Sequence, residues 1–128
     1  MANILVCDDD KDIVEAIEIY LTQEGYHILK AYDGQEALDI LKEKKDDISL
    51  ILLDITMPVM DGYTATKKIR SLEHSDAKTI PIIAMTANAF QEDAEKCIAV
   101  GMNAHLAKPL NIEKMMTTIC HLVKKKNE

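Results

Sequence analysis

The segment NILVCDDD, residues 3–10, places a mostly apolar run directly before three consecutive aspartates. The run has the length of a β-strand and is apolar on successive residues, which is typical of a strand buried on both faces of a parallel sheet. Adjacent carboxylates repel one another, and capping a helix needs only one of them. The placement of Asp8, Asp9 and Asp10 therefore indicates a binding site as well as a fold.

Four further runs of strand length follow along the chain. Between them, apolar residues recur at the i, i+3, i+4 and i+7 spacing of amphipathic helices. Strands that alternate with helices predict a parallel sheet with helices on both faces and right-handed crossovers. The four runs are HILKAY, SLILLD, IPIIAM and AHLAK, which start at His27, Ser49, Ile80 and Ala104.

The predicted helices carry boundary residues of their own. Gly25 and Gly101 stand where the first and fourth helices should end. Asp10, Asp61 and Asn111 are candidate caps at the starts of the first, third and last helices. The predicted inner faces are Ile13, Ala16, Ile17, Tyr20 and Leu21; Ala37, Leu38 and Leu41; Ala65, Ile69 and Leu72; Ala94, Cys97 and Ile98; and Ile112, Met115, Met116, Ile119, Leu122 and Val123.

Length and charge narrow the classes of function. The 128 residues suit one domain, predicted over 1–128 with a folded core at 3–124. A net charge of −7 argues against nucleic acid, whose phosphates need a basic surface. No stretch approaches the roughly 18 apolar residues of a membrane helix. The three cysteines lack a disulfide or zinc pattern, and Cys7 and Cys97 fit buried positions, so we expect a soluble, cytoplasmic protein.

Polar residues stand at or just after the carboxyl ends of the predicted strands. In a doubly wound sheet these ends form the edge where sites assemble. Asp8, Asp9 and Asp54 would meet there, and a hard divalent cation such as Mg²⁺ would compensate for their mutual repulsion. Thr86 adds a hydroxyl and Lys108 a fixed positive charge. These groups suit phosphoryl transfer, with a carboxylate as the nucleophile.

Four motifs in order resemble the receiver domain of two-component response regulators. They are ILVCDDD, LILLDITMPVMDG, IPIIAMTA and AHLAKPL, and together they span nearly the whole chain. The resemblance implies a flavodoxin-like (βα)5 fold, an α/β three-layer sandwich whose five-stranded parallel sheet has the order 2-1-3-4-5. It also implies a cis peptide between Lys108 and Pro109.

The same resemblance assigns roles to single residues. Asp54 would accept the phosphoryl group, while Thr86 and Lys108 would contact it. The ligands of Mg²⁺, or of Mn²⁺ in its place, would be Asp8, Asp9, Asp54 and the backbone carbonyl of Thr56.

A conformational switch is also implied by the resemblance. Thr86 and His105 would form the switch, although His105 stands where the family more often has Tyr or Phe. Thr56 and Asn88 would tune the lifetime of the phosphoryl group, and because neither is charged we expect no strong acid or base assistance to hydrolysis. The output surface would lie around Phe90, Glu95, His105 and Lys114.

The predicted function is that of a signalling switch. The domain would take a phosphoryl group from a phosphohistidine of a sensor kinase or a histidine phosphotransfer protein. It would then control an unidentified downstream partner or domain, as a monomer or a phosphorylation-dependent dimer. It would catalyse only its own phosphorylation and dephosphorylation. We expect no direct binding to nucleic acid or membrane.

Three other functions fit the sequence less well. A haloacid-dehalogenase-type phosphatase would need an acid where Thr56 stands. A flavodoxin-like cofactor binder would need a Ser/Thr/Gly-rich phosphate loop in place of Asp8–Asp10, and the sequence has no P-loop. A degenerate receiver that only docks partners would not need the complete set of Asp, Thr and Lys residues.

Overall fold

The computed structural model describes residues 2–44, 48–57, 60–72, 79–87 and 91–126. Five parallel strands form one sheet in the order β2-β1-β3-β4-β5, as the sequence predicted. Strands and helices alternate along the chain: β1 (Asn3–Cys7), α1 (Lys11–Gln23), β2 (His27–Ala31), α2 (Gly34–Lys44), β3 (Leu50–Asp54), α3 (Gly62–Arg70), β4 (Ile82–Thr86), α4 (Gln91–Val100), β5 (Ala104–Ala107) and α5 (Ile112–Lys126).

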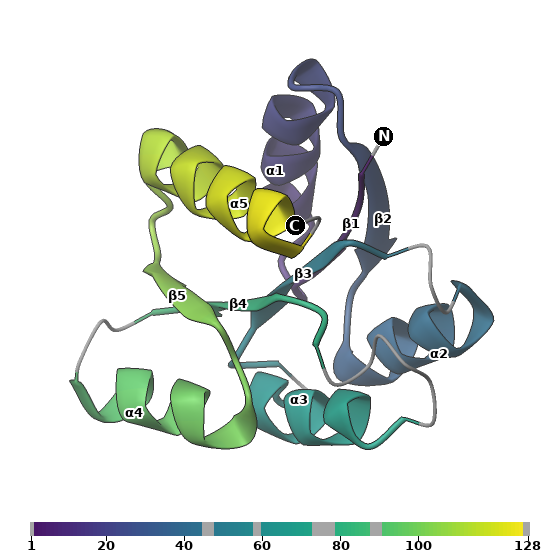
Figure 1. The fold of residues 1–128 in the computed structure, drawn as a ribbon, viewed down its shortest axis with the longest axis vertical. Coiled ribbons are helices and arrows are strands. Elements are labelled where there is room, and N and C mark those ends of the chain that lie inside the picture. Colours follow the sequence, from purple (N-terminus) through teal and green to yellow (C-terminus); the bar gives the residue numbers. More distant parts are fainter. Residues whose placement is uncertain (1, 45–47, 58–59, 73–78, 88–90, 127–128) are drawn as a thin grey trace.

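Two layers of helices cover the sheet. Helices α1 and α5 lie on one face, and α2, α3 and α4 lie on the other (Figure 1). Each face has its own hydrophobic core, because successive residues of a strand point to opposite sides. Ile4 and Val6 of β1 pack on the α1–α5 side, whereas Leu5 and Cys7 pack on the α2–α4 side. The central strands are therefore apolar on both faces, which explains the continuous apolar runs.

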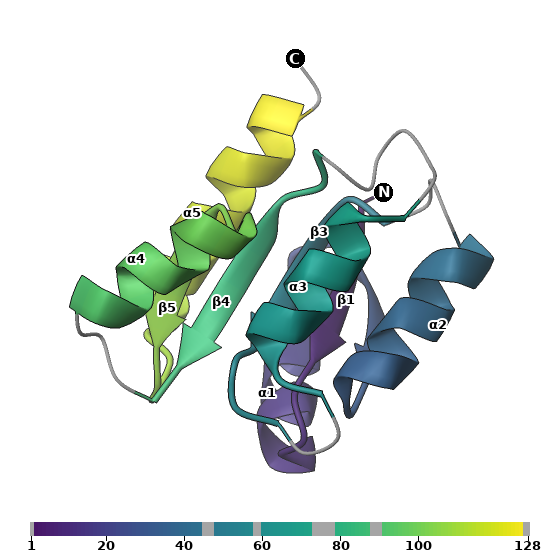
Figure 2. The same cartoon turned by 90° about the horizontal axis from the view of Figure 1, so that it is seen from below.

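The register of the strands aligns their carboxyl ends. Cys7 pairs with Leu53, so the residues that follow them, Asp8 and Asp54, reach the edge at the same level. Thr86 is paired with Ala107, and Lys108 comes next in the chain. All neighbouring strands are parallel, and the arrowheads of β4 and β5 in Figure 2 point toward the same edge of the sheet. The topology alone therefore brings four separate segments together.

Two predicted helix faces were partly wrong. In α1 the buried residues are Val14, Ile17 and Leu21, while Tyr20 is 42% exposed. Ala16, which was also assigned to the inner face, is exposed. Helix α1 meets the sheet along a line rotated toward Val14, because packing rather than the widest apolar stripe sets its orientation.

Helix α4 differs from its predicted face in the same way. Cys97 is buried and Val100 packs against the same core, but Ile98 is 72% exposed. Neighbouring residues of a helix differ by about 100° in direction, so Ile98 points away from the side that Cys97 and Val100 share. The side chain of Ala94 lies outside the described residues.

The predicted caps are confirmed. Asp10 accepts hydrogen bonds from Asp12 N and Ile13 N at the start of α1, and Asp61 accepts one from Thr64 N at the start of α3. Gly25, with φ of 92°, takes the left-handed conformation just past the end of α1 that favours glycine.

The ends of β5 and α5 carry two further features. Asn111 accepts a hydrogen bond from Lys114 N at 2.9 Å, which confirms it as the cap of α5. The Lys108–Pro109 peptide is cis, as the resemblance implied. Within the described part of the chain, no helix is both long enough and apolar enough to cross a membrane.

Candidate functional site

Three carboxylates converge at the carboxyl edge of the sheet. Asp8, Asp9 and Asp54 each place a side-chain oxygen within 4.8 Å of the others. Asp8 and Asp54 are buried, with 0% and 3% of their surface exposed, while Asp9 is exposed to solvent. The sequence predicted this convergence from the ends of two separate strands, and the geometry confirms it.

The three consecutive aspartates have three different environments. Asp8 Oδ1 accepts a hydrogen bond from Asp10 N at 2.9 Å, which turns the chain from β1 into α1. The carboxylate of Asp10 caps α1, because its Oδ1 accepts a hydrogen bond from Asp12 N at 3.0 Å. Asp9 stands between them and is exposed. Capping therefore accounts for Asp10 alone, and Asp8 and Asp9 are left for another role.

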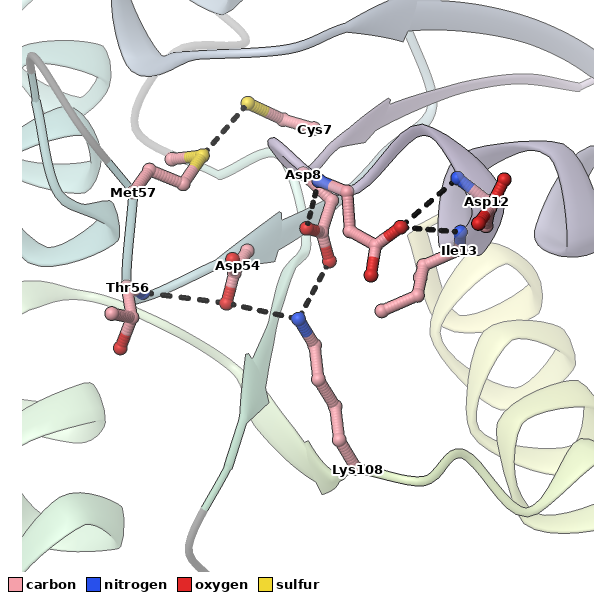
Figure 3. Close-up of polar contacts among 9 residues, drawn as sticks. Cys7, Asp8, Asp12, Ile13, Asp54, Thr56, Met57 and Lys108 are labelled. Atoms are coloured by element: carbon pink, nitrogen blue, oxygen red, sulfur yellow. Dashed lines mark hydrogen bonds and ion pairs between the residues drawn. The ribbon is translucent and has the colours of Figure 1, made fainter.

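Lys108 links the two buried carboxylates. Its Nζ lies 2.8 Å from Asp8 Oδ2 and 3.4 Å from Asp54 Oδ1 (Figure 3). Asp54 Oδ1 also accepts a hydrogen bond from Thr56 N at 3.3 Å. Lys108 is itself held in place, because its main-chain N donates to Thr86 O at 2.7 Å. This hydrogen bond holds the backbone of Lys108 against the end of β4, and the side chain extends from there to Asp8 and Asp54.

Gly62 allows the first turn of α3 to lie against the end of β3. A Cβ atom at this position would be 2.5 Å from Asp54 O and 2.7 Å from Ile55 Cα. Gly62 N also donates to Ile55 O at 3.1 Å. A side chain at this position would therefore collide with the backbone of Asp54 and Ile55, which gives Gly62 a steric role at the site.

The electrostatics of the site are unbalanced. Burial raises the pKa of Asp54 to about 6, and the charge of Asp8 acts in the same direction, while Lys108 and Thr56 N lower it less. Burial tends to lower the pKa of Lys108, but Asp8 and Asp54 outweigh it and the pKa is raised. Lys108 therefore remains charged, and its single positive charge faces three carboxylates.

The donor set fits a small divalent cation. One ammonium against three carboxylates leaves two negative charges when all are ionised. Among the described residues, the Lys108 ammonium is the one partner of the buried Asp8 Oδ2, which is left with unused acceptor capacity. Mg²⁺ prefers a few carboxylate oxygens together with water and phosphate oxygens. Such an ion would neutralise the remaining charge.

The other predicted site residues that the structure describes lie on β4, β5, α4 and α5. Thr86 is buried at the end of β4, where it pairs with Ala107, the residue before Lys108. His105 is half-buried on β5 opposite Ala84. Glu95 and Lys114 are exposed on α4 and α5. Asn88 and Phe90 lie outside the described residues.

Comparison with known proteins identifies the family. The family model described as response regulator receiver domain matches residues 4–120. The chain belongs to the response regulator receiver domain family. The receiver is a signalling module of two-component systems, as the four motifs suggested. The match covers the sheet from the second residue of β1 onward and most of α5.

Relatives agree in sequence and in fold. The chain is 38% identical over 127 residues to the hybrid signal transduction histidine kinase I of Dictyostelium discoideum. The aligned region covers 94% of this chain but 7% of that protein. The chemotaxis protein CheY4 of Vibrio cholerae has 33% identity and a TM-score of 0.87, with 95% and 98% of the two chains covered.

A receiver with bound metal is also similar. The receiver domain of a sensor histidine kinase from Pseudomonas aeruginosa has 35% identity and a TM-score of 0.84, with 96% and 98% of the two chains covered. That structure holds a magnesium ion in its active-site cleft.

Proposed function

We propose that Asp54 of this receiver accepts a phosphoryl group from a phosphohistidine, in a reaction that requires Mg²⁺. The observation that carries the proposal is the cluster of Asp8, Asp9 and Asp54 within 4.8 Å, with Lys108 bound to two of them. The ion would be held by these carboxylates and by the main-chain carbonyl of Thr56. Mn²⁺, which also accepts carboxylate and carbonyl oxygens, would substitute for it.

The chain's own residues position the reacting groups. A carboxylate oxygen of Asp54 forms a bond to phosphorus as the P–N bond of the phosphohistidine breaks, and the electron pair of that bond stays on the imidazole, which takes up a proton. Lys108 stabilises the negative charge of the phosphoryl oxygens, and the Thr86 hydroxyl donates a hydrogen bond to one of them. A divalent cation held by the carboxylates would supply further charge neutralisation. Burial of Asp54 limits the access of water to its carboxyl group.

The phosphoryl donor would be a sensor histidine kinase or a histidine phosphotransfer protein, and the site would also catalyse slow loss of the phosphoryl group. Thr56 and Asn88, both uncharged, would set that rate, and an acyl-phosphate lifetime of only seconds would contradict this part. Residues 1–128 would form a single receiver domain with its folded core at 3–124, working in the cytoplasm as a monomer or a phosphorylation-dependent dimer.

Phosphorylation would change the conformation of Thr86 and His105. The half-buried position of His105 leaves room for a response on the outer face of β5. The surface around His105, Glu95 and Lys114, together with Phe90, would then contact a downstream partner or domain. The chain spans 7%, 15% and 13% of the length of three curated relatives.

Acetyl phosphate provides a direct test. With Mg²⁺, the wild type should gain the mass of one phosphoryl group, and the gain should be lost with Asp54→Asn or with excess chelator. Asp61→Asn is a matched control, because Asp61 is an aspartate that only caps α3. No gain on the wild type, or an unchanged gain on Asp54→Asn, would refute the proposal. Catalytic release of phosphate from small phosphoesters would favour the phosphatase alternative instead.

A further inference from the structure

A set of buried contacts lies directly behind the acidic cluster. Cys7, which precedes the first aspartate, places its Sγ 3.6 Å from Met57 Sδ and donates to Asp33 O at 3.2 Å. Figure 3 shows the two sulfur atoms pointing toward each other. Met57 directly follows Thr56, and Asp33 directly precedes α2. The contacts therefore join the end of β1, the start of α2 and the segment that follows β3.

Gly34 brings the start of α2 close to the same segment. A Cβ at Gly34 would be 2.9 Å from Met60 Cβ and 3.0 Å from Met60 O. Neither of these atoms lies at the flexible end of a side chain. The described glycines with positive φ are Gly25 and Gly101, so the conformation of Gly34 does not demand glycine. Glycine is less favourable than alanine in a helix, and the close approach explains why it is present here.

The start of α2 is itself firmly held. Asp33 accepts a hydrogen bond from Glu36 N on its carboxylate at 2.8 Å, and Ala37 N donates to Asp33 O at 3.2 Å. Ala37 and Leu38 are buried in the core on that face of the sheet. The start of α2 therefore supports the connection between β3 and α3 at two points. Asp33 contacts Cys7, which in turn contacts Met57. Gly34 lies directly against Met60.

We propose that Cys7, Gly34 and Met57 are positioning residues for the divalent cation. None of them would touch the ion. Together they would fix the Thr56 carbonyl relative to the three carboxylates. The backbone of Thr56 is continuous with that of Met57, which Cys7 contacts, and Met60, which Gly34 approaches, lies three residues further along the chain. The inference rests on the proposed function, since it concerns the same cation site.

Simple core packing is the competing explanation, and the two differ in what they predict. A residue that only packs changes the fraction of folded molecules but leaves the Mg²⁺ affinity of the folded ones unchanged. A positioning residue changes that affinity. Outer contacts of metal ligands typically alter metal affinity by about 10–100-fold when they are mutated.

The test compares Mg²⁺ binding by calorimetry in Gly34→Ala, Met57→Ala and the wild type, each shown to be folded by circular dichroism. Gln35→Ala changes an exposed residue in the same turn of α2 and serves as the matched control for Gly34. Met57→Leu keeps most of the side-chain volume and is the control for Met57→Ala. The rate of phosphorylation by acetyl phosphate is then measured over a range of Mg²⁺ concentrations.

We expect Gly34→Ala and Met57→Ala to weaken Mg²⁺ binding by about tenfold, with the phosphorylation rate restored at saturating Mg²⁺. Both control variants should stay within about twofold of the wild type. If Gly34→Ala does not fold, the comparison of Met57→Ala with Met57→Leu tests the inference. Wild-type affinity in folded Gly34→Ala or Met57→Ala would overturn the inference and leave the proposed function intact. Absence of Mg²⁺ binding by the wild type would overturn both.

Discussion

The two ends of the sheet differ in how their charged side chains are compensated. At the carboxyl edge, Asp8 and Asp54 share one lysine and retain excess negative charge. At the other end, the Arg70 guanidinium donates to Ile80 O at 2.8 Å and, through Nη2, to Gly101 O at 2.6 Å and Asn103 Oδ1 at 3.0 Å. Burial lowers the pKa of Arg70, and these three acceptors of its hydrogen bonds are neutral.

This difference separates structural charge from functional charge. Arg70 ties the end of α3 to the segments that enter β4 and β5, and Asn103 Oδ1 also accepts from Ile82 N at 2.9 Å. The acidic cluster makes few internal hydrogen bonds and carries a raised pKa at Asp54. A buried charge that the protein leaves unbalanced is a candidate binding group, whereas a fully bonded one is a candidate structural support.

The largest expected effect is that of removing Arg70. Arg70→Ala should lower the free energy of unfolding by about 3 kcal/mol, because it leaves part-buried carbonyls without their charged donor. Arg70→Lys should recover little of the loss, since an ammonium cannot reproduce the forked contacts. Urea unfolding measures both variants. Mg²⁺ affinity of the folded Arg70→Ala protein should not change, and a large change would break the proposed separation between the two ends.

Removal of Lys108 should have a smaller effect that depends on metal. Lys108→Met should destabilise the metal-free protein by about 2 kcal/mol at pH 7, because it leaves two buried carboxylates without their counter-charge. Lys30→Ala, which breaks the exposed pair with Glu18, should cost less than about 0.5 kcal/mol and serves as the control. Mg²⁺ should reduce the deficit of Lys108→Met, and a deficit independent of Mg²⁺ would contradict the charge argument.

The smallest effect is a gain in stability. Asp54→Asn should stabilise the metal-free protein by about 1–2 kcal/mol at pH 7, because it removes a carboxylate whose ionisation burial and Asp8 disfavour. The pKa of Asp54 is near its ordinary value of 3.8 in the unfolded chain and about 6 in the folded one. The folded state therefore binds more protons between these values, and wild-type stability should fall as pH rises through about 4 to 6.

Thermal unfolding of the metal-free proteins between pH 4 and pH 7 measures this. The difference between Asp54→Asn and the wild type should be small near pH 4 and grow toward pH 7. A difference that shrinks as pH rises would show that the Asp54 carboxylate is stabilised by Lys108 more than it is destabilised by burial and Asp8.

The sequence predicted those features that depend on the spacing of apolar residues and on the order of strands and helices along the chain. Buried strands, capped helices and the meeting of Asp8 with Asp54 all follow from the rule that parallel strands end at one edge. The exposure of Ile98 and Tyr20 did not follow, because an apolar stripe does not fix the rotation of a helix on its sheet.

The contacts of Arg70 and Cys7 were also beyond prediction. They join residues 31 and 26 positions apart, respectively, and depend on how far α3 and α2 reach along the sheet. Gly34 and Gly62 carry a partial signal in the sequence, since a glycine at the start of a helix departs from helix propensity. The atoms that required glycine were visible only in three dimensions.

The assembly of the charged site from β1, β3 and the end of β5 has a consequence for the protein's synthesis. The amino-terminal half of the chain emerges with both buried acids but without the lysine that balances them, and only the late carboxyl-terminal segment supplies it. A chain that stops before Lys108 would carry both buried acids without their counter-charge, and we expect its acidic site to be less stable than in the complete sheet.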